Sequence, residues 1–192
     1  MAPQYFIIVG LEVFENYINK LTNAQSSLAF EEWDQAIFIV KDKIDSDKQI
    51  FTIGNGGSAS TASHLATDLG KGLSMKLNKR VRVISLNEHT SLLTAISNDI
   101  SFSNIFEFQL KNLSNEGDLL IAISGSGNSD NIIQAIKFAK QNKVFVIGLV
   151  GFDGGKIKNQ LDHCIHVRIN DMQIVEDIHG IFGHVILQNL NL

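Results

Sequence analysis

The chain has 192 residues, of which 44% are hydrophobic and 19% charged, as in an ordinary globular protein with a substantial core. Its formal net charge of -4 provides no basic field for a phosphate backbone, which argues against a nucleic-acid-binding function. One cysteine, Cys164, cannot form an internal disulfide, and no apolar run approaches the length of a membrane span. We therefore expect a cytoplasmic protein without a membrane partner.

Two amphipathic helices are expected before the first strand. Apolar residues recur at helical spacing in residues 11–21 and again in residues 28–44. Their apolar faces are long for a chain whose sheet is expected to carry helices on both sides. We therefore expect residues 1–47 to form an N-terminal helical extension that joins a helical layer between subunits.

From residue 49 onward, short β-rich apolar runs alternate with longer helical patterns. The runs expected to be strands are 50–53, 81–86, 119–123, 144–150 and 164–167, and a last helix is expected over 172–190. Strands that alternate with helices form a parallel sheet covered on both faces. The pattern predicts a doubly wound α/β fold with a five-stranded parallel sheet. Since no repeat or linker divides the chain, residues 1–192 are expected to form one domain with its core in 48–192.

The first expected strand leads directly into a glycine-rich turn, Gly54-Asn55-Gly56-Gly57-Ser58. Backbone N–H groups in such a turn can approach an anion, and the N-terminus of the following helix adds a favourable dipole. The alternative is a tight strand-to-helix turn that needs glycine only for its positive φ. The turn has neither the dinucleotide fingerprint G-x-G-x-x-G nor the Gly-Lys-Ser/Thr of a nucleoside triphosphate loop.

A second turn, with the sequence SGSGNS at 124–129, follows the third expected strand and precedes a helix that begins near Ile132. Its serine hydroxyls can donate hydrogen bonds to a phosphate, although Asn128 or Ser129 could serve only as a helix cap. The carboxyl ends of parallel strands meet at one edge of the sheet. Two such turns therefore predict a binding site for a phosphorylated ligand at that edge.

Four motifs resemble the sugar isomerase (SIS) domain of the phosphoheptose isomerases. They are the first turn with His64 six residues after its serine, ISND at 96–99, ISGSGNS at 123–129, and VEDIH at 175–179. The resemblance extends from about residue 49 to the C-terminus. It implies a flavodoxin-like SIS fold and a homotetramer with active sites shared between subunits.

The resemblance also implies which residues contact the substrate. They are Ser58, Ser124, Gly125, Ser126 and Ser129 for the phosphate, Asn55, Gly56 and Gly57 for the sugar chain, and Asn98, Asp99 and Glu176 for further contacts. Gly125 replaces a threonine of the family, so that its backbone N–H would have to do the work of the missing hydroxyl.

A metal site is suggested by two pairs of residues at helical spacing. His64 and Asp68 lie four residues apart after the first turn, and Glu176 and His184 lie eight apart near the C-terminus. Imidazoles and carboxylates on one helix face can bind Zn²⁺, although each histidine alone could be an ordinary surface or core residue. The expected zinc ligands are these four residues, with Gln173 as an alternative to Glu176.

An aldose–ketose isomerase needs a base near the substrate carbon and a proton donor at the developing oxyanion. The resemblance implies that Asp68 is the base and His184 the acid. The family has a glutamate at the position of Asp68 and a glutamine at that of Glu176. A shift of about 1 Å in a catalytic group can cost on the order of 100-fold in rate, so these departures bear on function. His179 is expected either near the ligands or on the solvent-facing side of the last helix.

The function that the resemblance implies is the isomerisation of sedoheptulose 7-phosphate to D-glycero-D-manno-heptose 7-phosphate by proton transfer between C1 and C2. This reaction would supply nucleotide-activated heptose for a lipopolysaccharide or capsule. One alternative is isomerisation of another ketose phosphate. A second alternative, which the departures at Asp68 and Glu176 keep open, is a non-catalytic sugar-phosphate-binding regulator or assembly protein.

Overall fold

The computed structural model describes residues 4–190, with side chains from residue 10 onward. The helices are α1 (Gln4–Ala24), α2 (Phe30–Asp45), α3 (Gly57–Thr67), α4 (Ser74–Leu77), α5 (Thr90–Asp99), α6 (Glu107–Leu113), α7 (Asp130–Gln141) and α8 (Met172–Asn189). The strands are β1 (Ile50–Gly54), β2 (Val83–Ser85), β3 (Leu119–Ser124), β4 (Phe145–Gly151) and β5 (His163–Val167). A π-helical segment, Asp68–Leu73, joins α3 to α4.

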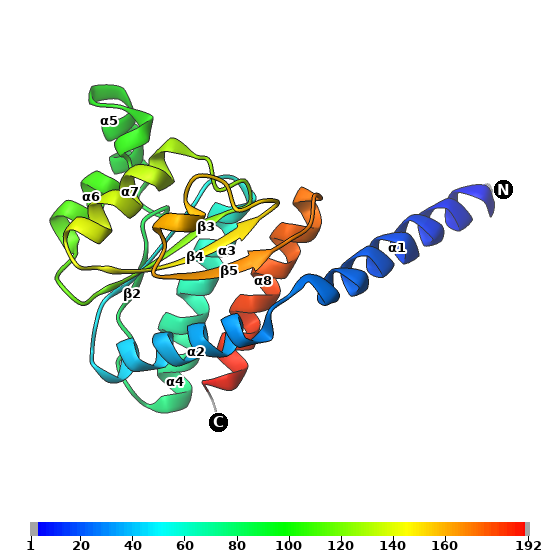
Figure 1. The fold of residues 1–192 in the computed structure, drawn as a ribbon, viewed down its shortest axis with the longest axis horizontal. Coiled ribbons are helices and arrows are strands. Elements are labelled where there is room, and N and C mark those ends of the chain that lie inside the picture. Colours follow the sequence, from blue (N-terminus) through cyan, green and yellow to red (C-terminus); the bar gives the residue numbers. More distant parts are fainter. Residues whose placement is uncertain (1–3, 191–192) are drawn as a thin grey trace.

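The strands form one parallel sheet in the order β2-β1-β3-β4-β5, with helices on both faces (Figure 1). The predicted doubly wound α/β fold is therefore confirmed, as are the two helices before the first strand. The strand order reverses between β1 and β3. In such a sheet the carboxyl ends of these two strands flank the crevice in which ligands bind.

Alternating side chains of the central strands divide the interior into two cores. Ile121 and Ile123 of β3 pack with apolar residues of α2, α3 and α8. Leu120 and Ala122 face the other way, toward α5, α6 and α7. All residues of β1 and β3 are buried because helices cover both faces, which explains why these strands are continuous apolar runs rather than alternating ones.

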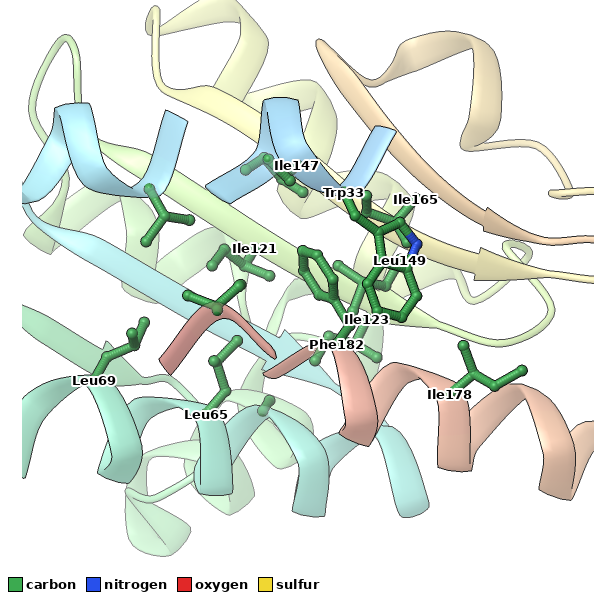
Figure 2. Packing of buried hydrophobic residues seen from close by; sticks show 14 of the residues in the cluster. Trp33, Leu65, Leu69, Ile121, Ile123, Ile147, Leu149, Ile165, Ile178 and Phe182 are labelled. Atoms are coloured by element: carbon green, nitrogen blue, oxygen red, sulfur yellow. The ribbon is translucent and has the colours of Figure 1, made fainter. Parts of the chain in front are cut away.

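The first core fixes α8 against α2 and α3. The ring of Trp33 in α2 meets the edge of Phe182 in α8, with ring centroids 5.1 Å apart, and Leu65 of α3 lies in the same cluster (Figure 2). Burial of large side chains such as these contributes about 1.5–3 kcal/mol each. Helices α3 and α8 are thereby held side by side, with their polar residues available to form a site.

Helix α1 projects away from the rest of the protein (Figure 1). Its C-terminal half is attached to α8 and its N-cap, because the Tyr17 hydroxyl donates to Asp177 at 2.7 Å and Lys20 pairs with Asp171 at 3.2 Å. Among the described residues, no helix combines the length and the apolar composition that crossing a bilayer would require.

The predicted strand at 81–86 is shorter than expected. The ladder of β2 contains only Val83–Ser85, and Ile84 is 43% exposed. Strand β2 lies at the edge of the sheet, and its pairing with β1 begins at Val83 opposite Ile50 and stops at Ser85 opposite Thr52, although β1 continues to Gly54. Asn87, just beyond β2, instead contacts the turn that follows β1.

Candidate functional site

The turn between β1 and α3 depends on glycine at three positions. Gly56 has a φ of +54°, and a Cβ atom at Gly54 would lie 2.4 Å from the carbonyl oxygen of Ser58. A Cβ atom at Gly57 would lie 2.5 Å from a carboxylate oxygen of Glu176. Helix α3 begins at Gly57 with no side chain capping its N-terminus. Its first N–H groups therefore have no capping side chain.

The second turn, between β3 and α7, is held against the loop after β4. Gly127 has a φ of +63°, and a Cβ atom there would lie 2.2 Å from the carbonyl oxygen of Gly154. Ser129 is the N-cap of α7, but its side chain makes no capping hydrogen bond. The possibility that Ser129 serves only as a helix cap is therefore wrong, and its hydroxyl is available to a ligand.

Gly125 of the second turn stands where the resemblance expects a threonine. A Cβ atom at Gly125 would lie 2.6 Å from the sulfur of Met172, the first residue of α8. Met172 thus fills the space that a larger residue at 125 would need. The loss of the threonine hydroxyl at position 125 is therefore accompanied by an apolar side chain, that of Met172, in the neighbouring space.

The two turns meet at one cavity of about 120 Å³. It is lined by Asn55, Ser58, Ile123, Ser124, Gly125, Ser126, Ser129, Met172 and Glu176. The volume is about four times the ~30 Å³ that a water molecule occupies in the liquid, so that a small anion can enter. Serine hydroxyls line this cavity, and the N-termini of α3 and α7, whose N-cap residues make no side-chain capping hydrogen bond, adjoin it at Ser58 and Ser129. This combination suits a phosphate group. We call it the phosphate cavity.

Two asparagines that sequence reasoning missed hold the first turn in place. Asn87 accepts from the Gly54 N–H at 3.2 Å and donates to the Gly54 carbonyl at 2.8 Å. Asn131 exchanges two amide hydrogen bonds with Asn55, of 2.9 and 2.8 Å. Asn87 could have been found by its position just after a strand that ends at the same sheet edge. Asn131 carried no comparable signal, because its partner lies 76 residues away.

A cluster of two histidines and one aspartate lies between α3 and α8. The Nε2 atoms of His64 and His184 lie 3.5 and 3.9 Å from the same oxygen of Asp68, and the two imidazole rings meet edge to face at 5.0 Å. The three side chains line a cavity of about 170 Å³. The imidazoles are 60% and 55% exposed, whereas the carboxylate is 23% exposed.

The donor set of this cluster fits a divalent metal. One ligand atom from each residue lies within 4.8 Å of the other two. Bond lengths of about 2.0–2.2 Å put the ligands of a tetrahedral Zn²⁺ roughly 3–3.5 Å apart, so that small side-chain rotations would close the set. Two imidazoles and a carboxylate with an open fourth position are typical of catalytic rather than structural zinc sites.

Glu176, which was expected among the metal ligands, is not part of this three-residue group. Its carboxylate lies against Gly57 and lines the phosphate cavity. Gln173, the alternative ligand, is exposed on α8. Eight residues along a helix correspond to about 12 Å, so Glu176 and His184 lie on the same face of α8 but too far apart along its axis to bind one ion.

Asn98 and Asp99, the further expected substrate contacts, lie at the C-terminal end of α5. Both are exposed, and the Asn98 amide donates to the Asp99 carboxylate at 2.8 Å. Neither lines the phosphate cavity. The segment that follows them, 101–103, instead lines a larger cavity of about 640 Å³ together with Asn55, Gly56, Ser129, Asp130 and Asn131.

His179 does not lie on the solvent-facing side of α8, so that alternative is wrong. Its side chain is 1% exposed, and Nε2 lies 3.3 Å from the carbonyl oxygen of Val150 at the end of β4. Burial, which disfavours the charged imidazolium, lowers the pKa of His179 to about 4, although the hydrogen bond to Val150 opposes the shift. His179 is therefore a neutral core residue that ties α8 to the sheet.

Comparisons with known proteins give consistent results. A SIS domain family model matches residues 13–151. The phosphoheptose isomerase of Clostridium acetobutylicum is 38% identical over 156 residues, which cover 81% of this chain and 79% of that protein. The phosphoheptose isomerase of Campylobacter concisus is 37% identical over 178 residues, or 93% and 91% of the two chains. The solved structure of the Neisseria gonorrhoeae phosphoheptose isomerase matches with a TM-score of 0.86 at 31% identity, covering 94% of this chain and 97% of that one.

Proposed function

The chain belongs to the SIS domain family and, within it, to the phosphoheptose isomerases, and we propose on this basis that it interconverts sedoheptulose 7-phosphate and D-glycero-D-manno-heptose 7-phosphate. The protein is thus an aldose–ketose isomerase that acts on a small sugar phosphate. The reaction moves one proton between C1 and C2 and needs neither an oxidant nor a second substrate.

The observation that carries this proposal is the meeting of two turns at the phosphate cavity. Hydroxyls of Ser58 and Ser126, together with the N-termini of α3 and α7, converge there on a space for one anion. We assign the 7-phosphate to this cavity, with Ser124, Gly125 and Ser129 as further contacts. Asn55, Gly56 and Gly57 then lie beside the adjoining part of the sugar chain.

The proton transfer is assigned to the cluster formed by His64 of α3, Asp68 of the π-helical segment that follows it, and His184 of α8. Ser58 and His64 lie six residues apart on α3, about 9 Å along its axis, which a seven-carbon phosphorylated chain can span. Asp68 would abstract the proton, because it is the carboxylate of the cluster. His184, whose Nε2 lies 3.9 Å from Asp68, would donate a proton to the developing oxyanion from the imidazole nitrogen that does not bind the metal.

The same residues would hold a divalent metal such as Zn²⁺. The ligands in this proposal are His64, Asp68 and His184, with Glu176 adjacent to the phosphate rather than to the ion. A bound Zn²⁺ would supply Lewis-acid polarisation of the substrate carbonyl. His64 additionally orients the Asp68 carboxylate, from which its Nε2 is separated by 3.5 Å.

We further propose a cytoplasmic homotetramer in which each active site is shared between subunits. The imidazoles of His64 and His184 are more than half exposed in the single chain, and a second subunit would cover them. An exposed apolar face of α1, with Leu11 and Phe14 57% and 61% exposed, supplies a surface for that contact. The heptose phosphate formed would be consumed by enzymes that activate it as a nucleotide sugar for surface polysaccharide.

Incubation of the purified protein with sedoheptulose 7-phosphate, with and without added Zn²⁺, tests the proposal. Nuclear magnetic resonance of the sugar should show conversion to the aldose, with faster turnover when the metal is added. Tight binding of the sugar phosphate without any conversion would instead favour the regulator or assembly protein. Conversion of a shorter ketose phosphate at a higher kcat/KM would shift the substrate assignment.

Replacing Asp68 with Asn tests the assigned base. The amide keeps the shape of the carboxylate but cannot take up the substrate proton, so kcat should fall by about 100- to 10,000-fold. The dissociation constant of sedoheptulose 7-phosphate, measured by calorimetry, should change little, because the phosphate cavity is intact. Full activity of Asp68→Asn would remove this residue from the mechanism.

A further inference from the structure

Asn131 is buried near the start of α7, yet the proposed reaction assigns it no role. Its side chain is 2% exposed, and it is the second residue of the helix that follows the second turn. Its amide exchanges hydrogen bonds of 2.9 and 2.8 Å with that of Asn55, which belongs to the first turn. The oxygen of Asn131 also accepts from the backbone N–H of Ile132 at 3.0 Å. Asn131 therefore bridges the two turns through a single side chain.

The hydrogen bond from Ile132 determines how both amides are oriented. A backbone N–H can only donate, so the group of Asn131 that faces Ile132 must be its oxygen. The nitrogen of Asn131 is then directed at the oxygen of Asn55, and the nitrogen of Asn55 at the oxygen of Asn131. This leaves Asn55 with one N–H and one acceptor lone pair for a ligand, both in a defined direction.

Asn55 is the residue for which this orientation matters, because it borders two cavities. It lines the phosphate cavity of about 120 Å³ and also the cavity of about 640 Å³ that includes Ser101 and Ser103. Asn131 lines the larger cavity but not the phosphate cavity. A sugar chain whose phosphate lies in the first cavity would present its nearest hydroxyls to Asn55.

We propose that Asn131 is a positioning residue, which fixes the amide of Asn55 so that its remaining N–H and oxygen meet the hydroxyls next to the substrate phosphate. The inference rests on the proposed binding of a sugar phosphate. It separates two tasks within the first turn. Asn87 holds the turn backbone at Gly54, next to the phosphate cavity wall at Asn55, and Asn131 orients the side chain that contacts the sugar.

A double-mutant cycle tests this assignment with Asn55→Ala, Asn131→Ala and the variant that carries both changes. Calorimetry would give the dissociation constants of sedoheptulose 7-phosphate and of inorganic phosphate, and kcat/KM would be measured in parallel. Asn142→Ala is the matched control, because this exposed asparagine ends the same helix and its side-chain amide donates to the Phe138 carbonyl rather than to either turn. If Asn131→Ala does not fold, Asn131→Ser takes its place. Serine is compatible with the first turn of a helix, but its side chain is too short to reach Asn55.

Each single variant should bind sedoheptulose 7-phosphate about 10-fold more weakly, which is the effect of losing one or two ordered hydrogen bonds. The affinity of the double variant for this sugar phosphate should fall by about the same factor, rather than by about 100-fold, because Asn131 acts through Asn55. Affinity of Asn131→Ala for inorganic phosphate should change by less than about 2-fold, since Asn131 does not line the phosphate cavity and the Asn87 contact to Gly54 remains.

The proposal would be overturned if the two fold-losses in affinity for sedoheptulose 7-phosphate multiplied in the double variant. It would also be overturned if Asn131→Ala lost as much affinity for inorganic phosphate as for the sugar phosphate, because that would indicate a general collapse of the turn. A wild type that binds sedoheptulose 7-phosphate no more tightly than inorganic phosphate would also overturn it. Absence of turnover in the wild type, with the binding cycle as expected, would instead contradict the isomerase function and leave the positioning role supported.

Discussion

At the level of single residues, Glu176 brings a carboxylate to the wall of the phosphate cavity. Two like unit charges 4 Å apart repel by about 1 kcal/mol even in bulk water. Glu176→Gln keeps the side-chain shape and removes the charge, and it restores the residue that the resemblance expects. We therefore expect inorganic phosphate to bind about 5-fold more tightly to this variant, as measured by calorimetry.

Asp177→Asn is the control for this comparison, because it removes the same charge from the neighbouring residue, which points to solvent and to Tyr17 rather than into the cavity. It should leave phosphate affinity almost unchanged. If Glu176→Gln bound phosphate equally well or less well than the wild type, the carboxylate would not face the bound anion.

His179 makes the stability of the fold depend on pH. Its pKa is lowered to about 4 in the folded protein, mainly by burial, whereas an unfolded chain has a value near 6.5. As pH falls from about 6.5 toward 4, the unfolded state takes up this proton and the folded state does not. Stability that is present above pH 6.5 is therefore lost across this window, by up to about 3 kcal/mol. Burial also lowers the pKa of His166, which adds a loss of the same sign.

Urea unfolding at pH 7.5 and pH 4.5 measures this effect. His179→Gln, which cannot titrate, should lose less free energy of unfolding between the two pH values than the wild type does. The control is His89→Asn, at an exposed position where asparagine preserves the N-cap acceptor of α5. An equal loss in His179→Gln and the wild type would assign the pH dependence to other groups.

At the level of elements, the two turns depend on backbone geometry that only glycine provides. Gly127 combines a φ of +63° with a backbone contact that would place a Cβ atom 2.2 Å from the carbonyl oxygen of Gly154. Gly127→Ala should therefore lower the free energy of unfolding by about 1–3 kcal/mol and weaken phosphate binding as the second turn moves. Thermal unfolding and calorimetry would measure the two effects.

Gly10→Ala is a suitable comparison, because this glycine lies in α1 and a Cβ atom there would meet nothing within 4 Å. It should stabilise α1 slightly and leave phosphate binding unchanged. A Gly127→Ala variant with normal stability and affinity would show that the loop after β4 can move away without consequence.

The strands and the two turns could be predicted because their signals are local. An apolar run such as 119–123 and the glycines after it specify a buried strand and a strand-to-helix turn without reference to the rest of the chain. The edge strand was less predictable, since the apolar run at 81–86 extends beyond the residues that pair with β1. The chain leaves the ladder after Ser85 and places Asn87 against Gly54, and this tertiary contact is not reported by any local pattern.

The detailed arrangement of the site could not be read from spacing alone. Residues 176 and 184 share a face of α8, and this pattern predicted a single ligand set. The structure separates them because α8 runs alongside α3, so that Glu176 reaches the start of α3 whereas His184 reaches Asp68, about three turns further along. The burial of His179 likewise depends on which face of α8 meets β4, and the pairing of Asn55 with Asn131 joins residues 76 apart.

At the level of the whole molecule, α1 exposes large apolar side chains in the part of the chain that the structure describes. Leu11, Val13 and Phe14 are each more than half exposed. At its base, a cavity of about 310 Å³ with mainly apolar walls lies between the start of α2 and α8, and includes Leu21, Trp33 and Ile178. An extended helix with such a face is stable in water when a second helix covers it. This arrangement supports the proposed assembly through α1.

Changing Leu11 and Phe14 together to Asp should disrupt that assembly. Each substitution places a charge on the proposed contact face, and light scattering coupled to size exclusion at micromolar concentration should show a tetrameric wild type and a smaller variant. Because His64 and His184 would lose the covering subunit, kcat/KM for sedoheptulose 7-phosphate should fall with the mass. The control Asn16→Asp adds the same kind of charge at another exposed position of α1 and should keep both mass and activity. A monomeric wild type with full activity would show that one chain completes the site, and that the exposed face of α1 has another purpose.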